Sequence, residues 1–425
     1  MTQMAILNAR ILDPASSTDE TGGLIVADGV IVDFGPHIKS APDGAEAIDA
    51  NGLCLAPGLV DLRVKTGEPG EEHRETLASA SRAAVAGGVT SMVVMPDTNP
   101  VIDDVAVVEF ITRRAADTAL NRIYPAGALT NGLEGSAMAE IGLMQESGAV
   151  FFTNGDQALA DASTMRRAMT YAASRDAVVA SRPAELSLSG GMMNSGAFAA
   201  RMGLSGLPAD AEWIALARDL TLAETTGCAL IVDLISTGRS LEMVSQARQR
   251  GARVGVTAAA YSFFFNELDV GDYLTYCKVQ PPFRSEDERQ ALIAGLKSGE
   301  IDAVVSAHDP QPPEAKRVPY AEAAFGAAGL ETTLAAMLAL FHDGRLSLLE
   351  ALKPLTSGPA DLIDLPQGRL AAGAPADFML FDPGAPWLCQ REDLRSRSTN
   401  SPFDGRRLEG LVMQTWVGGK SVFKR

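Results

Sequence analysis

Two cations stand directly behind a predicted buried strand near the start of the chain. The apolar run Leu59–Leu62 predicts the strand, and Arg63 and Lys65 follow it at alternate positions. Alternate residues of an extended backbone point to the same side, so both side chains could face one site. Charged guanidinium and ammonium groups donate hydrogen bonds and have no lone pair for a metal ion. This stretch therefore offers fixed positive charge where a metal site would need imidazole or carboxylate.

Histidine, the commonest metal ligand, is rare in this chain. There are four: His37, His73, His308 and His342. His37 is expected in a turn, His73 at the start of a helix and His342 near a helix end, and we expect structural or surface roles for all three. His308 and Asp309 are the only neighbouring pair in a candidate site that could ligate a metal, and a rebuilt metal site on them is kept as an alternative.

Composition narrows the classes of function. The chain has 425 residues, 46% hydrophobic and 21% charged, and a formal net charge of -17 without a basic cluster. This balance argues against binding to nucleic acid or to an anionic membrane surface. The sequence shows no signal pattern, no apolar run near the roughly 18 residues of a membrane span, and four scattered cysteines. We therefore expect a cytoplasmic protein with free, buried thiols.

Strand-like runs alternate with amphipathic helical stretches between about Gly58 and Leu362, a pattern typical of a parallel (β/α)8 barrel. Residues that follow the strands would then line the active-site face. The predicted strands are Leu59–Leu62, Val89–Met95, Arg122–Ala126, Ala149–Phe152, Ala177–Ala180, Ala229–Leu234, Arg253–Thr257 and Asp302–Ser306. Predicted helices between them include Glu72–Ala86, Ala137–Glu146, Ala209–Thr226 and Glu286–Leu296.

Both ends of the chain carry short β-rich runs separated by turn signals. Each end alone is too short for a strong core of its own. We therefore predict one small β-sandwich domain assembled from residues 1–57 and 363–425, beside a barrel domain of residues 58–362.

Several strings together identify the chain as similar to a known family. They are PGLVDLRVKTGEPG (Pro57–Gly70), AAVAGGVTSMVVMPDTNP (Ala83–Pro100), GALT (Gly127–Thr130), FGAAGLET (Phe325–Thr332) and SPFDGRRLEG (Ser401–Gly410). They resemble the dihydroorotase branch of the amidohydrolase superfamily, and the MPDTNP string favours dihydroorotases over hydantoinases and allantoinases. The resemblance implies a barrel with a zinc centre that activates water and polarises the amide carbonyl of dihydroorotate.

The first positions that the resemblance assigns to function are replaced here. The His-x-His pair of the family corresponds to Arg63 and Lys65, and the arginine for the substrate carboxylate corresponds to Gly67. The asparagine that contacts substrate corresponds to Asp97, a carboxylate that would repel an anionic substrate.

The later strand ends are replaced as well. Asn154 stands in the acidic ligand region, and Ser181 and Leu234 stand where the family has histidines. At the eighth strand the general base of the family corresponds to Ala307, followed by His308. A methyl group accepts no proton, and a catalytic zinc site needs at least three protein ligands.

From these replacements we predict a catalytically inactive homologue without zinc or another cofactor. The resemblance to inactive family members implies a structural role: a homo-oligomer within a larger assembly with the catalytic chain of aspartate transcarbamoylase. Arg63 and Lys65 would replace the metal and pair with Asp61, Asp97 or Asp309, or would instead extend into solvent.

Two other functions stay open. One is an active cyclic-amide hydrolase, metal-free or using His308 and Asp309, favoured by the retained FGAAGLET loop that in the family closes against substrate. The other is a sensor that binds a small metabolite in the vacated site.

Overall fold

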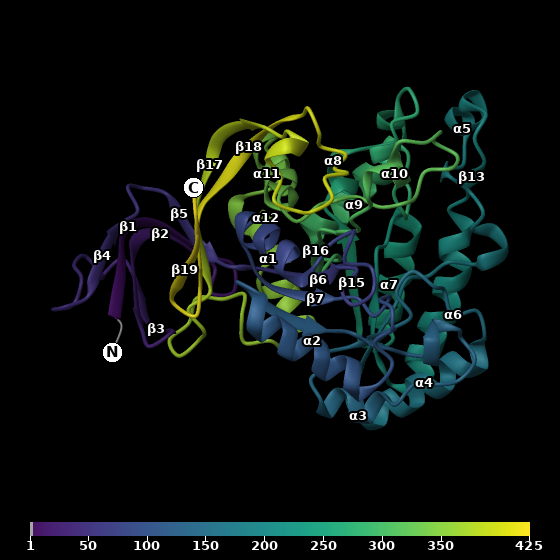
Figure 1. Ribbon diagram of the computed structural model, residues 1–425, viewed down its shortest axis with the longest axis horizontal. Helices are drawn as coiled ribbons and strands as arrows, with labels where there is room; N and C mark the ends of the chain where they lie inside the picture. Colours follow the sequence, from purple (N-terminus) through teal and green to yellow (C-terminus); the bar gives the residue numbers. More distant parts are fainter. Residues whose placement is uncertain (1–2) are drawn as a thin grey trace.

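The computed structural model describes residues 3–425, in which strands from both ends of the chain share one sheet (Figure 1). The sheet has the order β19-β18-β17-β5-β1-β2-β3, and β4 pairs with β1. Its strands are β1 (Gln3–Asp13), β2 (Thr18–Ala27), β3 (Val30–Gly35), β4 (Glu46–Asp49), β5 (Cys54–Pro57), β17 (Phe378–Leu388), β18 (Arg407–Val417) and β19 (Lys420–Lys424).

The two chain ends join where β5 runs antiparallel to β17, with Leu55 opposite Leu380. This sheet has an apolar core of its own, in which the rings of Phe378 and Trp416 stack 4.8 Å apart. The predicted composite of both termini is therefore confirmed, because neither end could bury these residues alone.

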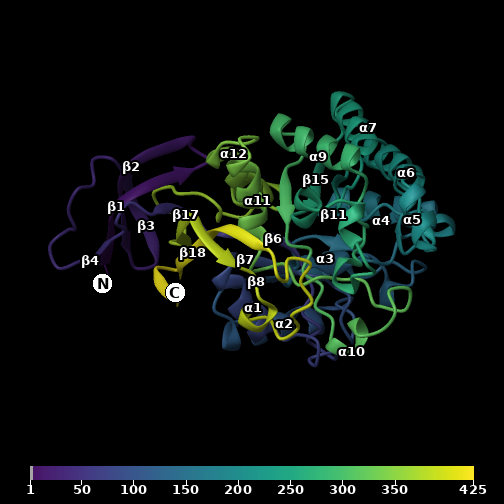
Figure 2. The same ribbon diagram turned by 90° about the horizontal axis from the view of Figure 1, so that it is seen from above.

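The strands between the two chain ends are parallel and form a barrel (Figure 2). They are β6 (Leu59–Val64), β7 (Val89–Val94), β8 (Arg122–Pro125), β9 (Gly127–Ala128), β10 (Phe152–Thr153), β11 (Val178–Ser181), β14 (Ala229–Val232), β15 (Val254–Ala259) and β16 (Ala303–Val305). The third barrel strand is interrupted at Ala126, between β8 and β9. The barrel closes after β16, where the backbone N–H of Lys65 donates to the carbonyl of His308 at 2.9 Å.

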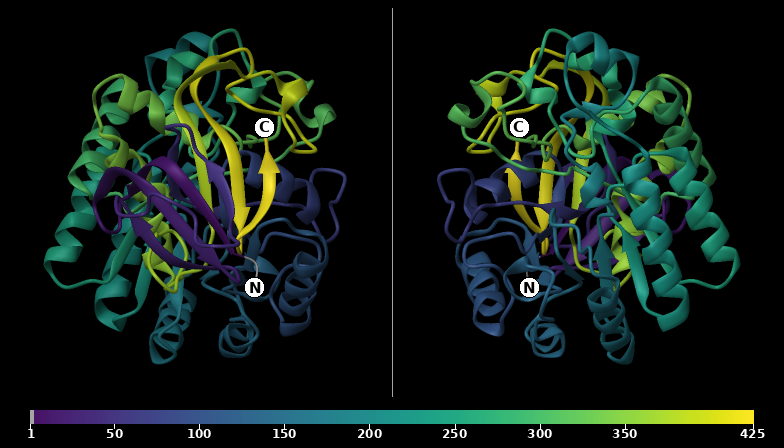
Figure 3. Two further views of the ribbon diagram at one scale, coloured as in Figure 1. Left: turned by 90° about the vertical axis from the view of Figure 1, so that its left-hand side faces the viewer. Right: turned by 90° about the vertical axis from the view of Figure 1, so that its right-hand side faces the viewer.

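Helices surround the barrel (Figure 3). They are α1 (Leu77–Ala86), α2 (Val105–Thr118), α3 (Ile141–Glu146), α4 (Ala162–Ser174), α6 (Asp210–Thr226), α7 (Gly238–Gln249), α9 (Glu286–Ser298), α11 (Thr333–His342), α12 (Leu348–Leu352) and α13 (Ser357–Leu362). Shorter elements in the loops are α5 (Ala197–Met202), α8 (Tyr261–Phe264), α10 (Pro313–Lys316), and the two-stranded pair β12 (Met193–Asn194) and β13 (Gly206–Leu207).

The predicted fold class is confirmed, and each predicted barrel strand overlaps an observed one. The helix predicted from Glu72 begins only at Leu77, because the Thr76 hydroxyl accepts from the N–H of Ser79 at 3.1 Å and caps the helix there. His73 consequently lies outside the helix. The domain division at residues 57/58 and 362/363 stays a prediction. Within residues 3–425, no helix is long and apolar enough to cross a membrane.

Candidate functional site

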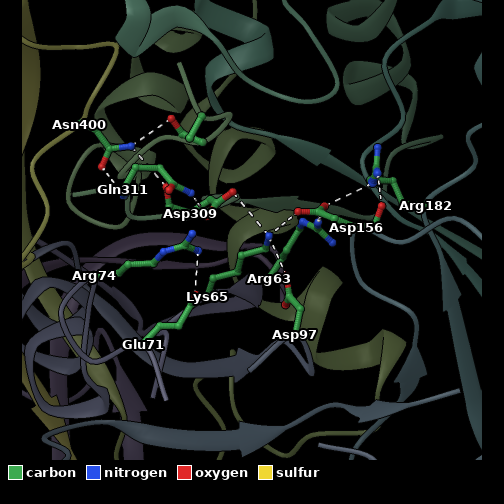
Figure 4. A network of polar contacts seen from close by, with 12 residues as sticks. Arg63, Lys65, Glu71, Arg74, Asp97, Asp156, Arg182, Asp309, Gln311 and Asn400 are labelled. Atoms are coloured by element: carbon green, nitrogen blue, oxygen red, sulfur yellow. Dashed lines mark hydrogen bonds and ion pairs between the residues drawn. The ribbon is translucent and has the colours of Figure 1, made fainter. Parts of the chain in front are cut away.

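Charged side chains from six strand ends meet at one face of the barrel (Figure 4). We call them the ionic cluster: Arg63 and Lys65 at β6, Asp97 after β7, Asp156 after β10, Arg182 after β11, Asp233 after β14 and Asp309 after β16. Because the strands are parallel, all these side chains come from the carboxyl ends, which is the active-site face of such barrels.

Lys65 lies at the centre of three carboxylates. Its Nζ is 2.7 Å from Asp97 Oδ2 and 3.5 Å from Asp309 Oδ2, and it also forms an ion pair with Asp156. Burial opposes the charge of this ammonium, but the three carboxylates outweigh burial and raise the pKa of Lys65. Lys65 is therefore a fixed positive charge.

Arg63 is buried, with 5% of its side chain exposed. Its Nη2 lies 2.5 Å from Asp156 Oδ1, and its Nη1 pairs with Asp233, which also accepts from the Thr257 hydroxyl at 2.9 Å. Burial would raise the pKa of Asp156, but Lys65, Arg63 and Arg182 hold it well below its usual range. Arg63, Lys65 and Asp156 are thus charged and paired with one another.

These contacts decide between the two predictions for the cations. Neither side chain extends into solvent, and the predicted pairing of Lys65 with Asp97 and Asp309 is found. Asp61 does not join it, because its carboxylate accepts the backbone N–H groups of Arg63 and Ser306 at 3.1 and 3.2 Å.

Three members of the cluster were missed from the sequence: Asp156, Arg182 and Asp233. Each lies within three residues of the end of its strand. Each also lies within four residues of the end of a predicted strand, but that position alone does not show which residue it pairs with. The ligand positions of the family correspond instead to the nearby residues Asn154, Ser181 and Leu234.

Two of these aligned positions bind partners outside the cluster. The amide oxygen of Asn154 accepts from the N–H and the hydroxyl of Thr130, both at 3.1 Å. The Ser181 hydroxyl donates to Asp219 Oδ2 at 2.7 Å. Asn154 is therefore bonded to the loop after β9, and Ser181 to helix α6.

Leu234, Ala307 and Gly67 occupy backbone positions with positive φ, at 57°, 49° and 70°. Leu234 and Ala307 line the cavity at the cluster. At Gly67 the turn is tight, because a Cβ atom would lie 2.6 Å from the carbonyl oxygen of Glu71. The arginine of the family does not fit this turn as it is built here.

The imidazole of His308 contacts residues outside the ionic cluster. Its Nδ1 accepts the backbone N–H of Gly329 at 3.2 Å, which leaves the proton on Nε2, 3.5 Å from Glu75 Oε2. Asp309 faces Lys65 and accepts from Gln311 Nε2 at 2.9 Å. The two residues of the alternative metal pair thus have different partners.

A small cavity of about 20 Å³ remains beside the cluster. Arg63, Lys65, Tyr261, Phe325 and Gly326 line part of it. This volume holds about one water molecule. A pyrimidine ring does not fit, so a substrate must displace part of this lining.

The cluster does not fit a zinc ion as it is arranged. Asp97, Asp156 and Asp309 converge on the ammonium of Lys65, which occupies the place between them. Across residues 3–425, no group of three or more His, Cys, Asp or Glu side chains is placed to hold a metal ion.

Known proteins match the chain from end to end. The model of the Dihydro-orotase-like family matches residues 52–240, and that of the Amidohydrolase family matches residues 302–423. A dihydroorotase from Pelobacter propionicus is 38% identical over 99% of this chain and 100% of its own length. A dihydroorotase from Syntrophotalea carbinolica is 40% identical over 99% of both chains. The chain belongs to the dihydroorotase family.

Solved structures share the fold of this chain. The L-hydantoinase (dihydropyrimidinase) from Arthrobacter aurescens superposes with a TM-score of 0.90 at 25% identity, covering 100% of this chain and 96% of that one. The dihydropyrimidinase from Brevibacillus agri gives 0.85 at 20% identity, with 100% and 95% covered, and this likeness shows the fold alone.

The comparisons correct two predictions. The prediction of a non-catalytic subunit is wrong, because the relatives that span the chain are named as the enzyme dihydroorotase, and the alternative of an active hydrolase fits better. The prediction that no cofactor is used is overturned by the same membership, since dihydroorotases are metal-dependent enzymes. Both predictions rested on the assumption that losing one set of ligands means losing the reaction.

Proposed function

We propose that this chain catalyses a dihydroorotase-type reaction, the reversible hydrolysis of a ring amide in dihydroorotate or a closely similar cyclic amide. The observation that carries the proposal is 37–40% identity to dihydroorotases over 99% of the chain. The ionic cluster is the proposed site, because it lies at the carboxyl ends of the barrel strands.

Amide hydrolysis needs an acceptor for the proton of water and positive charge near the developing oxyanion. Asp309 suits the first task, because burial raises its pKa and the neighbouring Asp156 and Asp97 add to this against the ammonium of Lys65. Lys65 suits the second task, because three carboxylates hold its ammonium group in place. Little reorganisation of the site would then be needed as the oxyanion develops. Asp309 would thus act as the proton acceptor, a role that the methyl side chain of Ala307 cannot fill.

Substrate entry requires movement of the lining. Phe325 and Gly326, the first residues of the FGAAGLET string, form part of the cavity wall. The backbone N–H of Gly326 donates to the carbonyl of Lys278 at 3.0 Å, and the backbone N–H of Asp309 donates to the carbonyl of Ala327 at 2.7 Å. Displacing this wall would open the cluster to a ring-sized ligand, and its return would exclude water.

The test is an assay of purified full-length protein with dihydroorotate in both directions, with and without added Zn²⁺, alongside a zinc determination. We expect turnover, and losses of about 100-fold or more in Lys65→Met and Asp309→Asn. Arg253→Gln, which removes a surface cation paired with Asp176, is the matched control. Absence of turnover in both directions under all conditions would overturn the proposal. Full activity in the folded Lys65→Met and Asp309→Asn variants would overturn the assigned roles.

We also place the protein in the cytoplasm, because its four cysteines are free and buried: Cys54, Cys228, Cys277 and Cys389. Burial raises the pKa of each thiol, that of Cys277 to about 12, so they stay unreactive. Recovery of the protein outside the cytoplasmic fraction of cells would contradict this placement.

A further inference from the structure

A second and larger cavity lies away from the barrel mouth, lined by residues of α1, α11, β17, β18 and the end of the chain. Figure 1 shows these elements. Its volume is about 330 Å³. Its apolar lining includes Leu334, Trp387, Leu388, Leu394 and Val412, and its charged lining consists of Glu331, Asp393, Arg395 and Arg425. Nothing in the proposed reaction uses these residues.

Two arginines are held close together on the wall of this cavity. The Cζ atoms of Arg395 and Arg425 lie 4.9 Å and 5.8 Å from the centre of the Phe423 ring. Burial and then the neighbouring Arg395 lower the pKa of Arg425, and Glu331 and Asp393 do not compensate. Two arginines and two carboxylates thus line this cavity, and the two guanidinium groups repel one another.

Glu331 is committed to other groups. Its Oε1 accepts the backbone N–H of Arg395 at 2.5 Å and that of Ser396 at 3.4 Å, while its Oε2 is 3.6 Å from Arg395 Nη1. Arg425 Nε donates to the carbonyl of Val412 at 3.3 Å. Arg395 Nη1 is thus ion-paired with Glu331, whereas within residues 3–425 no side chain accepts a hydrogen bond from the Nη atoms of Arg425. The Arg425 Nη atoms and the remaining guanidinium N–H groups of Arg395 are available to a ligand.

The rest of the lining is mostly apolar. Trp387 Nε1 donates to the carbonyl of Gly410 at 3.0 Å, which holds the indole in place. Leu334 and Val412 are buried beside it, whereas Leu388 is 45% exposed, as expected at the rim of an open cavity. A volume of about 330 Å³ is at the lower end of small-molecule sites, which start near 300 Å³.

We propose that this cavity binds a small organic anion, a single ring that bears a carboxylate or phosphate group. The anionic group would lie between Arg395 and Arg425, and the ring would pack against Trp387 and Leu334. A bound anion would offset the repulsion between the two guanidinium groups. It would also connect the sheet formed by both chain ends to α11. This site is separate from the ionic cluster and from the reaction proposed there.

The test titrates the full-length protein with phenyl phosphate, with benzoate and with the neutral isostere benzamide. Binding is followed by the fluorescence of Trp387 and by the thermal unfolding midpoint, which a ligand of the native state raises. We expect saturable binding of at least one of the two anions and none of benzamide. Arg395→Gln should weaken anion binding about tenfold or more. Trp387→Phe should abolish the fluorescence change but keep the thermal shift.

Arg397→Gln is the matched control, because it removes the same charge from the same segment while Arg397 does not line the cavity. Three results would overturn the proposal: no saturable binding of either anion, equal binding of benzamide, or equal weakening in Arg395→Gln and Arg397→Gln. The ionic cluster also holds cations, so the titration is repeated with Lys65→Met. Loss of binding in that variant, with Arg395→Gln unaffected, would place the anion at the barrel mouth and also overturn the proposal.

Discussion

His308 Nε2 lies 3.5 Å from Glu75 Oε2, and neither side chain reaches solvent. Glu75 precedes α1, and His308 follows β16, so this contact joins the two ends of the barrel near its closure. Glu75 also accepts from the backbone N–H of Arg397 at 3.1 Å and from the hydroxyls of Ser79 and Ser396. One carboxylate therefore organises three segments that are distant in the sequence.

Glu75→Gln should destabilise the fold in a pH-dependent way. Burial raises the pKa of Glu75, but the bonds from His308, Ser396 and Ser79 outweigh burial and lower it. The carboxylate therefore stabilises the fold above the ordinary glutamate pKa, and this contribution is lost as pH falls through the lowered value. We expect a loss of about 1–3 kcal/mol at pH 7, measured by urea unfolding. The difference in unfolding free energy between Glu75→Gln and wild type should become smaller at acid pH. A difference that becomes larger at acid pH would contradict this account.

Lys65→Met should destabilise the fold more strongly, because it leaves Asp97, Asp156 and Asp309 without their shared cation. Removing one partner of a buried ion pair costs about 3–5 kcal/mol. Arg253→Gln removes a pair in which both side chains are more than half exposed and should cost less than about 1 kcal/mol. The double variant Lys65→Met/Asp156→Asn should recover part of the loss in urea unfolding. Equal stability of Lys65→Met and wild type would contradict this prediction, because the three carboxylates would then not depend on Lys65.

Asp61→Asn tests a buried acid with the opposite pH behaviour. Burial raises the pKa of Asp61 to about 6, despite hydrogen bonds from Ser306 and Arg63. Between about pH 4 and 6 the folded protein binds the extra proton, so ionisation of Asp61 lowers the free energy of unfolding as pH rises. Relative to wild type, Asp61→Asn should gain up to about 3 kcal/mol between pH 4 and 7. Parallel stability curves for the two proteins across this range would contradict the raised pKa.

The fold could be predicted because its signals are local. Each barrel strand is a short apolar run, and the order of strands and helices limits the topology. The start of α1 was missed because the acidic residues from Glu71 onward resemble a first helical turn, whereas the cap at Thr76 decides the boundary.

The site could be predicted only in part. Arg63, Lys65 and Asp97 stand directly after strands and could be recognised there. Asp156 escaped because its role comes from pairing with Arg63 across the barrel, and no local pattern encodes a contact over that sequence distance. The function could not be predicted from the replaced metal ligands. Their loss excludes one kind of metal site, but it does not exclude other arrangements of residues on the same fold that could catalyse the reaction.

The association with the catalytic chain of aspartate transcarbamoylase stays a prediction, and it does not depend on whether the chain is an enzyme. Co-expression of both chains, followed by size-exclusion chromatography, tests it. We expect the two to elute together at a mass above that of either alone. Separate elution, with each protein fully active and stable, would remove this partner.

Gly67→Arg would restore the arginine that the family resemblance places before Glu68–Gly70. We expect this substitution to destabilise the fold. The position has φ 70°, and any Cβ would lie 2.6 Å from the carbonyl oxygen of Glu71. Backbone strain of this kind costs about 1–3 kcal/mol, and the displaced turn adds to it. Gly67→Ala carries the same Cβ without the guanidinium, so thermal unfolding should show similar losses for both variants. A Gly67→Arg protein as stable as wild type, with tighter binding of dihydroorotate, would show instead that the turn can accept the arginine of the family.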